Sequence, residues 1–491
     1  MLKPTPRLTT ALLCACLLLG LTPIQAAEHQ GPYPATELRS DFAALYEGLQ
    51  AAHFDLYVNT PKPDYDAAYA EAWKALDKPM SRMEARLFFQ RFVARSRIAH
   101  ARIDLPHQAY AEFREAGGKA FPLYIKVHDG KVRITENYSA SEQVSPGDEL
   151  LAVNDVALAD LLTEFRGYLS ADTDLMFNGF MEFRLPFLLW LKWGEVGTFS
   201  IRLQDSGGRV RNVKLAAQTA EQVRRNAKSQ PEILELDWQR QASMLPGDYA
   251  YLRPGPFFNT TEGADDVWDT TAFYQFIDTA FVQFNAADSK ALLIDLRNNP
   301  GGDASFSDRM ISWIADRPFR FTSGFFIKVS EQTTAANQAR LDAGSGGDGG
   351  ISADFAKEYA RREVGDVFEF AIPLVQPRDG RKFTRPVFAL VNRHSYSNTV
   401  TAAALLQDYS LATILGEETS DLATTYGAME QFTLPNTGIR VGYPKAFIVR
   451  PSGDRTVRGV VPDISIPTPL IEAASDPVLQ KAIAVMKARS E

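Results

Sequence analysis

Three short apolar runs in the second half of the chain constrain its fold most. They are ALLIDL at residues 291–296, PVFALV at 386–391 and ATIL at 412–415. Such runs are typical of strands covered on both faces, as in a parallel sheet with helices on either side. Helical patterns alternate with these runs from residue 248 onward. The sequence therefore predicts an α/β domain over residues 248–491.

The part of the chain before this domain has a different pattern. Residues 27–112 carry apolar side chains at helical spacing, which predicts an N-terminal helical domain. Residues 113–217 contain two pairs of strand-like runs, which predict a small, mostly β domain. These pairs are 121–127 with 131–134, and 198–203 with 210–215. Residues 218–244 are polar and are predicted to be helical, within a connector over residues 218–247. The expected fold class is multidomain, with α+β and α/β parts.

The first residues resemble a targeting segment. Lys3 and Arg7 precede an apolar run over residues 8–21, which is too short to span a bilayer, and small residues follow it. This order predicts a secretory signal peptide over residues 1–26. Both cysteines of the chain lie inside it, so the mature chain is expected to have no disulfide and no thiolate metal site. We expect an exported protein, periplasmic or secreted.

The charge balance limits the expected partners. The chain has 60 acidic and 52 basic residues, a formal net charge of -8. An acidic surface disfavours nucleic acid and anionic lipid as partners. No segment after the first 26 residues is long and apolar enough to suggest a membrane span in the mature chain. The sequence does not predict an oligomeric state.

Two strand-to-helix corners contain residues suited to chemistry. In DLRNNPGGD, residues 295–303, Gly301 and Gly302 allow backbone N–H groups to approach an anionic oxygen, although a plain tight turn has the same composition. The second corner, residues 392–397, ends in Ser397 at the start of a predicted helix. A serine there is either a helix cap or a nucleophile.

Four motifs resemble the C-terminal processing (tail-specific) peptidases. These are serine peptidases related to the tricorn core protease and the interphotoreceptor retinoid-binding protein. The matching segments are DLRNNPGG at 295–302, the helix and strand over 397–419, PGDELLAVNDV at 146–156 and GVVPDI at 459–464. The resemblance implies an N-terminal helical region, a PDZ-like β module and a crotonase/Clp-protease-like α/β core.

The resemblance also implies roles for individual residues. Ser397, rather than Ser395, is expected to be the nucleophile, and the amides of Gly302 and Asn398 are expected to form the oxyanion hole. Leu422 stands where the best-known members have a catalytic lysine, so the base must come from elsewhere.

Histidine is the natural substitute for the missing lysine. His100 lies where the tricorn branch has its histidine, while His394 and His107 are rivals. Asp454 is a possible orienting acid, although a dyad without one is an alternative.

We therefore expect an exported serine endopeptidase that acts through an acyl-enzyme on Ser397, with a polypeptide as substrate. This chemistry needs no metal and no cofactor. The PDZ-like module is expected either to hold an extended peptide by strand addition or only to pack against the core. The alternative is a catalytically inactive relative that binds peptides or apolar ligands.

Overall fold

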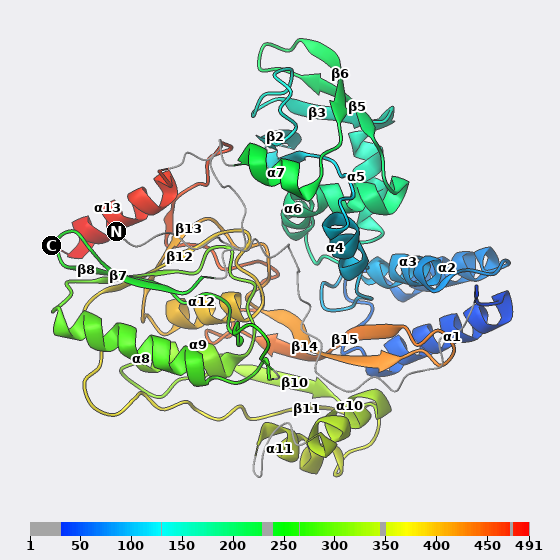
Figure 1. Ribbon diagram of the computed structural model, residues 1–491. Coiled ribbons are helices and arrows are strands. Elements are labelled where there is room, and N and C mark those ends of the chain that lie inside the picture. Colours follow the sequence, from blue (N-terminus) through cyan, green and yellow to red (C-terminus); the bar gives the residue numbers. More distant parts are fainter. Residues whose placement is uncertain are drawn as a thin grey trace.

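The computed structural model describes residues 31–128, 130–227, 239–264, 266–343, 350–471 and 475–490. The predicted signal peptide lies outside these ranges. Three sheets with their covering helices make up the described part (Figure 1). The expected multidomain fold with α+β and α/β parts is confirmed.

The N-terminal helices form where the apolar spacing predicted them. They are α1 (Ala35–Ala52), α2 (Lys62–Ala75) and α3 (Arg82–Val93), followed by a 3-10 turn (Ala94–Ser96) and α4 (His107–Glu115). Helix α3 begins at a capping box, in which the Ser81 hydroxyl accepts the Glu84 N–H and the Glu84 carboxylate accepts the Ser81 N–H. This reciprocal pair fixes the first turn of the helix.

An antiparallel sheet with two helices occupies the segment predicted to be mostly β. Its strands are β1 (Leu123–His128), β2 (Lys131–Asn137), β3 (Glu149–Val153), β4 (Val156–Ala157), β5 (Thr198–Gln204) and β6 (Val210–Ala216). The sequence did not predict its helices, α5 (Leu158–Arg166) and α6 (Asp174–Trp193). Helix α6 is apolar on most sides and contains Pro186, so it lacks the one-sided pattern by which a surface helix is found.

The connector is only partly helical. Helix α7 (Ala220–Ala227) agrees with the prediction, but β7 (Gln241–Leu245) is a strand antiparallel to β8 (Tyr249–Arg253). The helical prediction for residues 241–244 is therefore wrong. Strand β7 lies at the edge of its sheet, where Gln241 is exposed and the other four residues are partly buried.

The core sheet has the order β16–β13–β12–β9–β8–β7 and is parallel apart from β7. Its further strands are β9 (Leu292–Asp295), β12 (Val387–Val391), β13 (Thr413–Gly416) and β16 (Ile464–Ser465). Helices α8 (Thr271–Ala286), α9 (Ala304–Ser312) and α12 (Asn398–Asp408) pack on one face, and α13 (Pro477–Ser490) packs on the other. The three apolar runs form β9, β12 and β13, as predicted.

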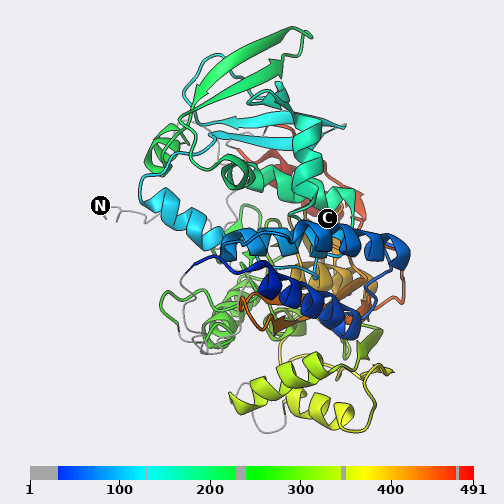
Figure 2. The same ribbon diagram turned by 90° about the vertical axis from the view of Figure 1, so that its right-hand side faces the viewer.

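A third, antiparallel sheet joins this core to the N-terminal helices. Its order is β11–β10–β15–β14, with β10 (Gly324–Lys328), β11 (Val367–Glu369), β14 (Thr425–Thr433) and β15 (Arg440–Val449). Helices α10 (Glu331–Asp342) and α11 (Ile351–Tyr359) pack near it. The β14–β15 hairpin shares one hydrophobic core with α1, α2 and α3. Figure 2 shows these blue helices across the middle of the molecule, below the β module.

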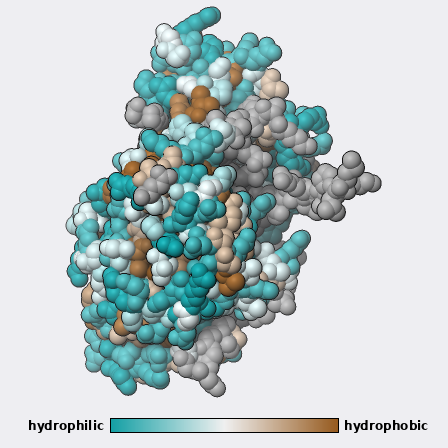
Figure 3. Space-filling model, turned by 90° about the vertical axis from the view of Figure 1, so that its left-hand side faces the viewer, coloured by the Kyte–Doolittle hydropathy of each residue, from teal (hydrophilic) through white to brown (hydrophobic). Residues whose placement is uncertain are grey.

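One face of the molecule can be judged by its hydropathy. On the face drawn in Figure 3, hydrophilic residues predominate and hydrophobic residues form small groups. None of the helices within the described ranges is both long and apolar enough to cross a bilayer.

Candidate active site

Two turns meet at the carboxyl ends of the neighbouring parallel strands β9 and β12. The Asn298 N–H donates to Asn392 Oδ1 at 3.1 Å, and Asn392 Nδ2 donates back to Asn298 Oδ1 at 2.8 Å. The Tyr396 N–H donates to the Asn299 carbonyl at 3.0 Å. The glycine-rich turn and the serine-rich turn are thereby joined into one unit.

The two serines of the second turn have different environments. Ser395 is fully buried, and its hydroxyl donates to the Leu296 carbonyl at 2.9 Å and accepts the Asn392 N–H at 3.1 Å. Ser397 is partly exposed, and its side chain makes no capping hydrogen bond to α12. The hydroxyl of Ser395 is thus occupied, whereas the geometry does not support the helix-cap reading of Ser397.

The backbone of Ser397 is strained. Its φ of 54° and ψ of -127° lie outside the regions that residues with a side chain normally adopt. Such a conformation costs about 1–3 kcal/mol and is typical of functional sites. A serine on a sharp strand-to-helix turn is also the arrangement that exposes a nucleophile.

The glycine turn leaves two amide groups beside Ser397. A Cβ on Gly301 would lie 2.8 Å from both Ser397 Cβ and the Asn398 nitrogen, so the two turns are in direct contact. Gly302, at φ 139°, pairs with Phe257 in a parallel bridge. Within the described ranges, neither the Gly302 N–H nor the Asn398 N–H has an acceptor. Both predicted oxyanion donors therefore remain free.

His100 lies beside this corner. Its ring stacks on that of Tyr396, the residue before the serine, with centroids 6.3 Å apart. Burial and the charge of Arg102 lower the pKa of His100 to about 4, and a hydrogen bond to the Tyr426 backbone opposes the shift. The ring is therefore neutral near pH 7, as a general base must be.

The other predicted candidates are engaged elsewhere. His394 Nε2 is 2.9 Å from Glu182 Oε2, and the His107 ring packs on Phe187 with centroids 4.4 Å apart. Asp454 is exposed, and its carboxylate accepts hydrogen bonds from the Thr456 N–H and hydroxyl at 2.9 and 2.7 Å. The structure thus brings Ser397, Gly302, Asn398 and His100 to one corner, and Asp454 makes its side-chain contacts elsewhere.

Two buried acids at this corner were missed by the sequence reasoning. Asp421 Oδ2 accepts the Ser397 N–H at 2.5 Å, and Asp172 Oδ2 accepts the N–H of Ala99 at 3.0 Å. Burial raises the pKa of Asp421 to about 6 and that of Asp172 to about 7. Asp421 comes directly before Leu422, which stands where related peptidases have a lysine. The sequence could therefore have pointed to Asp421 as a residue near the site. No motif marks Asp172.

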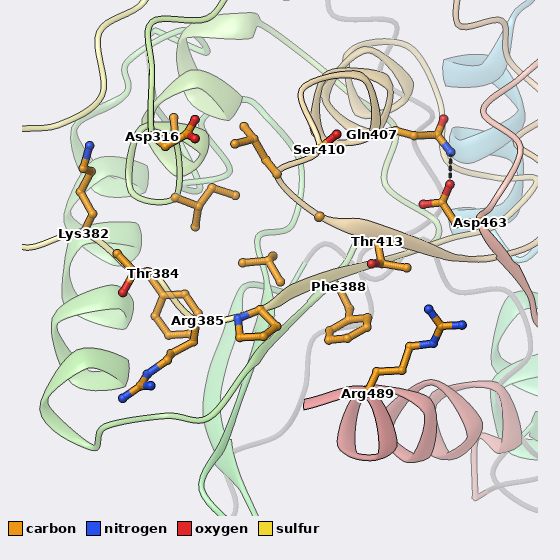
Figure 4. Close-up of a pocket in the computed structure, with 17 residues that line it drawn as sticks. Asp316, Lys382, Thr384, Arg385, Phe388, Gln407, Ser410, Thr413, Asp463 and Arg489 are labelled. Atoms are coloured by element: carbon orange, nitrogen blue, oxygen red, sulfur yellow. Dashed lines mark hydrogen bonds between the residues drawn. The ribbon is translucent and has the colours of Figure 1, made fainter. Parts of the chain in front are cut away.

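An open pocket of about 840 Å³ lies at the opposite, amino end of β12 and β13 (Figure 4). Lys382, Arg385 and Arg489 line it, together with Asp463, whose Oδ1 accepts a hydrogen bond from Gln407 at 2.9 Å. Because the two turns follow the carboxyl ends of the strands, this pocket is not part of the serine site.

The core fold and its nucleophile turn are those of a serine-type peptidase. Residues 260–466 match the model of peptidase family S41. This match confirms, for the α/β core, the resemblance to the C-terminal processing peptidases seen in its motifs.

Solved structures of mature CPAF have a similar fold over nearly the whole chain. The complex with lactacystin has a TM-score of 0.63 at 15% identity, covering 93% of this chain and 98% of that one. Another structure of mature CPAF has a TM-score of 0.62 at 17% identity, and the match covers 92% of this chain and 97% of that one. At this identity the likeness shows the fold alone.

Curated relatives match a shorter part. An uncharacterized protein of Chlamydia muridarum is 26% identical over 210 residues, which is 36% of this chain and 34% of that protein. A protein of Chlamydia trachomatis serovar D is 24% identical over 217 residues, 38% of this chain and 36% of its own. The chain thus aligns with about a third of the length of these relatives.

Proposed function

We propose that the protein is an active, exported serine endopeptidase with Ser397 as nucleophile. The observation that supports this most is the strained Ser397 backbone, with a side chain not used for capping, beside two amide N–H groups without acceptors. A purely structural cap has no need of backbone strain, and it would use its hydroxyl on the helix.

The reaction follows from these positions. His100 takes the proton of the Ser397 hydroxyl while the serine oxygen attacks the carbonyl carbon of a peptide. The Gly302 and Asn398 N–H groups then bind the resulting oxyanion, and such donors contribute about 100- to 1000-fold each. His100 gives its proton to the leaving amine as the C–N bond breaks. Water, deprotonated by His100, then releases the acyl group from Ser397.

The second candidate function is binding without catalysis. It is favoured by Leu422 at the lysine position and by Asp454, whose carboxylate is bonded to Thr456. The PDZ-like module over residues 113–217 belongs to either function, because its antiparallel sheet is of the kind to which an extended peptide can add as a strand.

Labelling with a serine-reactive phosphonate separates the two functions. We expect one adduct on Ser397, located by peptide mass spectrometry, and none in Ser397→Ala. Ser395→Ala is the matched control, because it removes a hydroxyl two residues away that is already hydrogen-bonded. Absence of an adduct on a folded protein supports the binding function instead.

A further inference from the structure

Two buried carboxyl groups hold the backbone of the proposed serine–histidine pair. Asp421, 1% exposed in the loop after β13, accepts the Ser397 N–H through Oδ2 at 2.5 Å and the Leu422 N–H through Oδ1 at 2.9 Å. Asp172, 7% exposed in the loop before α6, accepts the Ala99 N–H at 3.0 Å. Each carboxyl thus fixes a peptide group next to one member of the pair.

Each of these acids is buried and accepts a backbone N–H instead of pairing directly with a cation. Among the described residues, neither Asp172 nor Asp421 has a lysine or arginine within ion-pair distance. A buried carboxylate without such a partner is unfavourable, so the fold alone gives little reason to place two acids here. The charge of Asp421 also contributes to the raised pKa of Asp172, after burial, the largest cause.

We propose that Asp172 and Asp421 are the positioning acids of this site: as buried carboxylates they fix the peptide groups next to His100 and at Ser397. The proposal rests on the proposed function. Asp421 holds the strained turn and occupies the Ser397 N–H, which leaves Gly302 and Asn398 as oxyanion donors. Within the described residues His100 Nδ1 is buried without a partner, so Asp172 acts on His100 through the neighbouring Ala99 peptide group.

Two other groups act on this pair. The charge of Arg102 acts on both Asp421 and His100, and Tyr426 accepts the hydrogen bond of His100 while the charge of Asp172 acts on its hydroxyl. His100 has a pKa of about 4, whereas burial raises the pKa values of Asp421 and Asp172 to about 6 and 7. Turnover that rises with pH between about 6 and 7 therefore reports ionisation of the acid pair rather than of His100.

The first test uses the unaltered protein. Its rate of phosphonate labelling at Ser397 is measured from about pH 4 to pH 9. We expect the rate to rise through about pH 6 to 7 as the two carboxyls ionise. A rise confined to the region near pH 4 overturns the proposal without any variant.

The second test compares Asp421→Asn and Asp172→Asn with Asp41→Asn. Asp41 is also fully buried and accepts backbone N–H groups, from Asn436 and Thr437 at 2.9 and 2.8 Å, but it lies in α1 away from the serine. Asparagine keeps the acceptor oxygen and removes the charge. Misplaced catalytic groups lose about 100-fold, so we expect losses of this size at Asp421 and Asp172 and little change at Asp41.

The pH profile separates positioning from simple structural damage. A positioning role predicts that the residual rate of either site variant no longer rises between about pH 6 and 7. The proposal is overturned if both variants behave like Asp41→Asn or keep the profile of the unaltered protein. If Ser397→Ala is labelled as well as the unaltered protein, the proposed function itself fails, which is a separate outcome.

Discussion

Glu182 Oε2, on helix α6 of the β module, lies 2.9 Å from Nε2 of His394, three residues before Ser397. The same carboxylate also accepts a hydrogen bond from Arg393 at 2.9 Å, and Arg393 in turn pairs with Glu417 at 3.0 Å. Glu182 is 1% exposed. The β module is thereby attached to the nucleophile turn itself.

Removing this attachment should destabilise the protein. Breaking a buried ion pair costs about 3–5 kcal/mol when the other charge is left unpaired; Arg393 keeps its pair with Glu417, so the lower end of this range applies. We expect Glu182→Ala to lower the free energy of unfolding by about this amount and to reduce turnover. Glu221→Ala is the control, since its pair with Arg225 is exposed on α7. Equal denaturation midpoints for the two variants would contradict the structural role of Glu182.

The two serines of the turn should separate stability from activity. Ser395→Ala removes a buried hydroxyl with two partners, which costs about 1–3 kcal/mol and should lower the melting temperature while most activity remains. Ser397→Ala removes a partly exposed hydroxyl without a capping bond, so the melting temperature should be nearly unchanged while hydrolysis is lost. The reverse pattern in calorimetry and peptide turnover would show that Ser395 is the nucleophile.

His100 should act as one unit with Ser397. General bases contribute about 100- to 10,000-fold, so His100→Ala should lower turnover by a factor in this range. The double variant His100→Ala, Ser397→Ala should be no worse than Ser397→Ala alone, because the groups act in the same step. His394→Ala is the comparison. It leaves His100 in place, so this variant should keep substantial turnover. Wild-type turnover in His100→Ala would assign the base to another residue.

The glycine turn should tolerate no side chain. A Cβ at Gly302 would lie 2.0 Å from the Phe257 carbonyl oxygen, so Gly302→Ala must displace the bridge that orients the amide. Loss of an oxyanion donor predicts about 100- to 1000-fold slower turnover. Gly365→Ala is the matched control, because Gly365 also has a positive φ, 99°, but no atom lies within 4 Å of its Cβ position. Comparable kcat values for the two variants would remove this turn from the mechanism.

Ionisation of Asp172 should lower the free energy of unfolding as the pH rises. Its pKa is about 7 in the folded protein against 3.8 as the ordinary value, so the folded state binds more protons between about pH 4 and pH 7. This group's contribution to stability is therefore present at low pH and is lost as the pH rises through that window. Asp172→Asn has no such proton, so its stability relative to the unaltered protein should increase from about pH 4 to pH 7. Denaturant unfolding across this range provides the measurement, and a constant difference would contradict the raised pKa.

The sequence predicted those parts of the molecule in which local pattern and function coincide. The unbroken apolar runs became β9, β12 and β13, and the motifs located Ser397 and Gly302 at one corner. Helix α6 was missed because burial on most sides removes its amphipathic pattern, and Glu182 was missed with it. Asp172 and Asp421 meet the backbones of Ala99 and Ser397 only through tertiary packing, which no spacing along the chain encodes.

The core shared by the N-terminal helices and the β14–β15 hairpin has a consequence for when activity can begin. The segment that follows these helices and contains His100 is held by Arg102, which pairs with Gly442 of the hairpin through hydrogen bonds of 3.1 and 2.8 Å. A ribosome makes the hairpin only after most of the chain, so a nascent chain has the histidine but not the scaffold that holds it. Contacts this distant in sequence also form late in folding. The proposed base is therefore held beside Ser397 only once segments from both ends of the chain have come together.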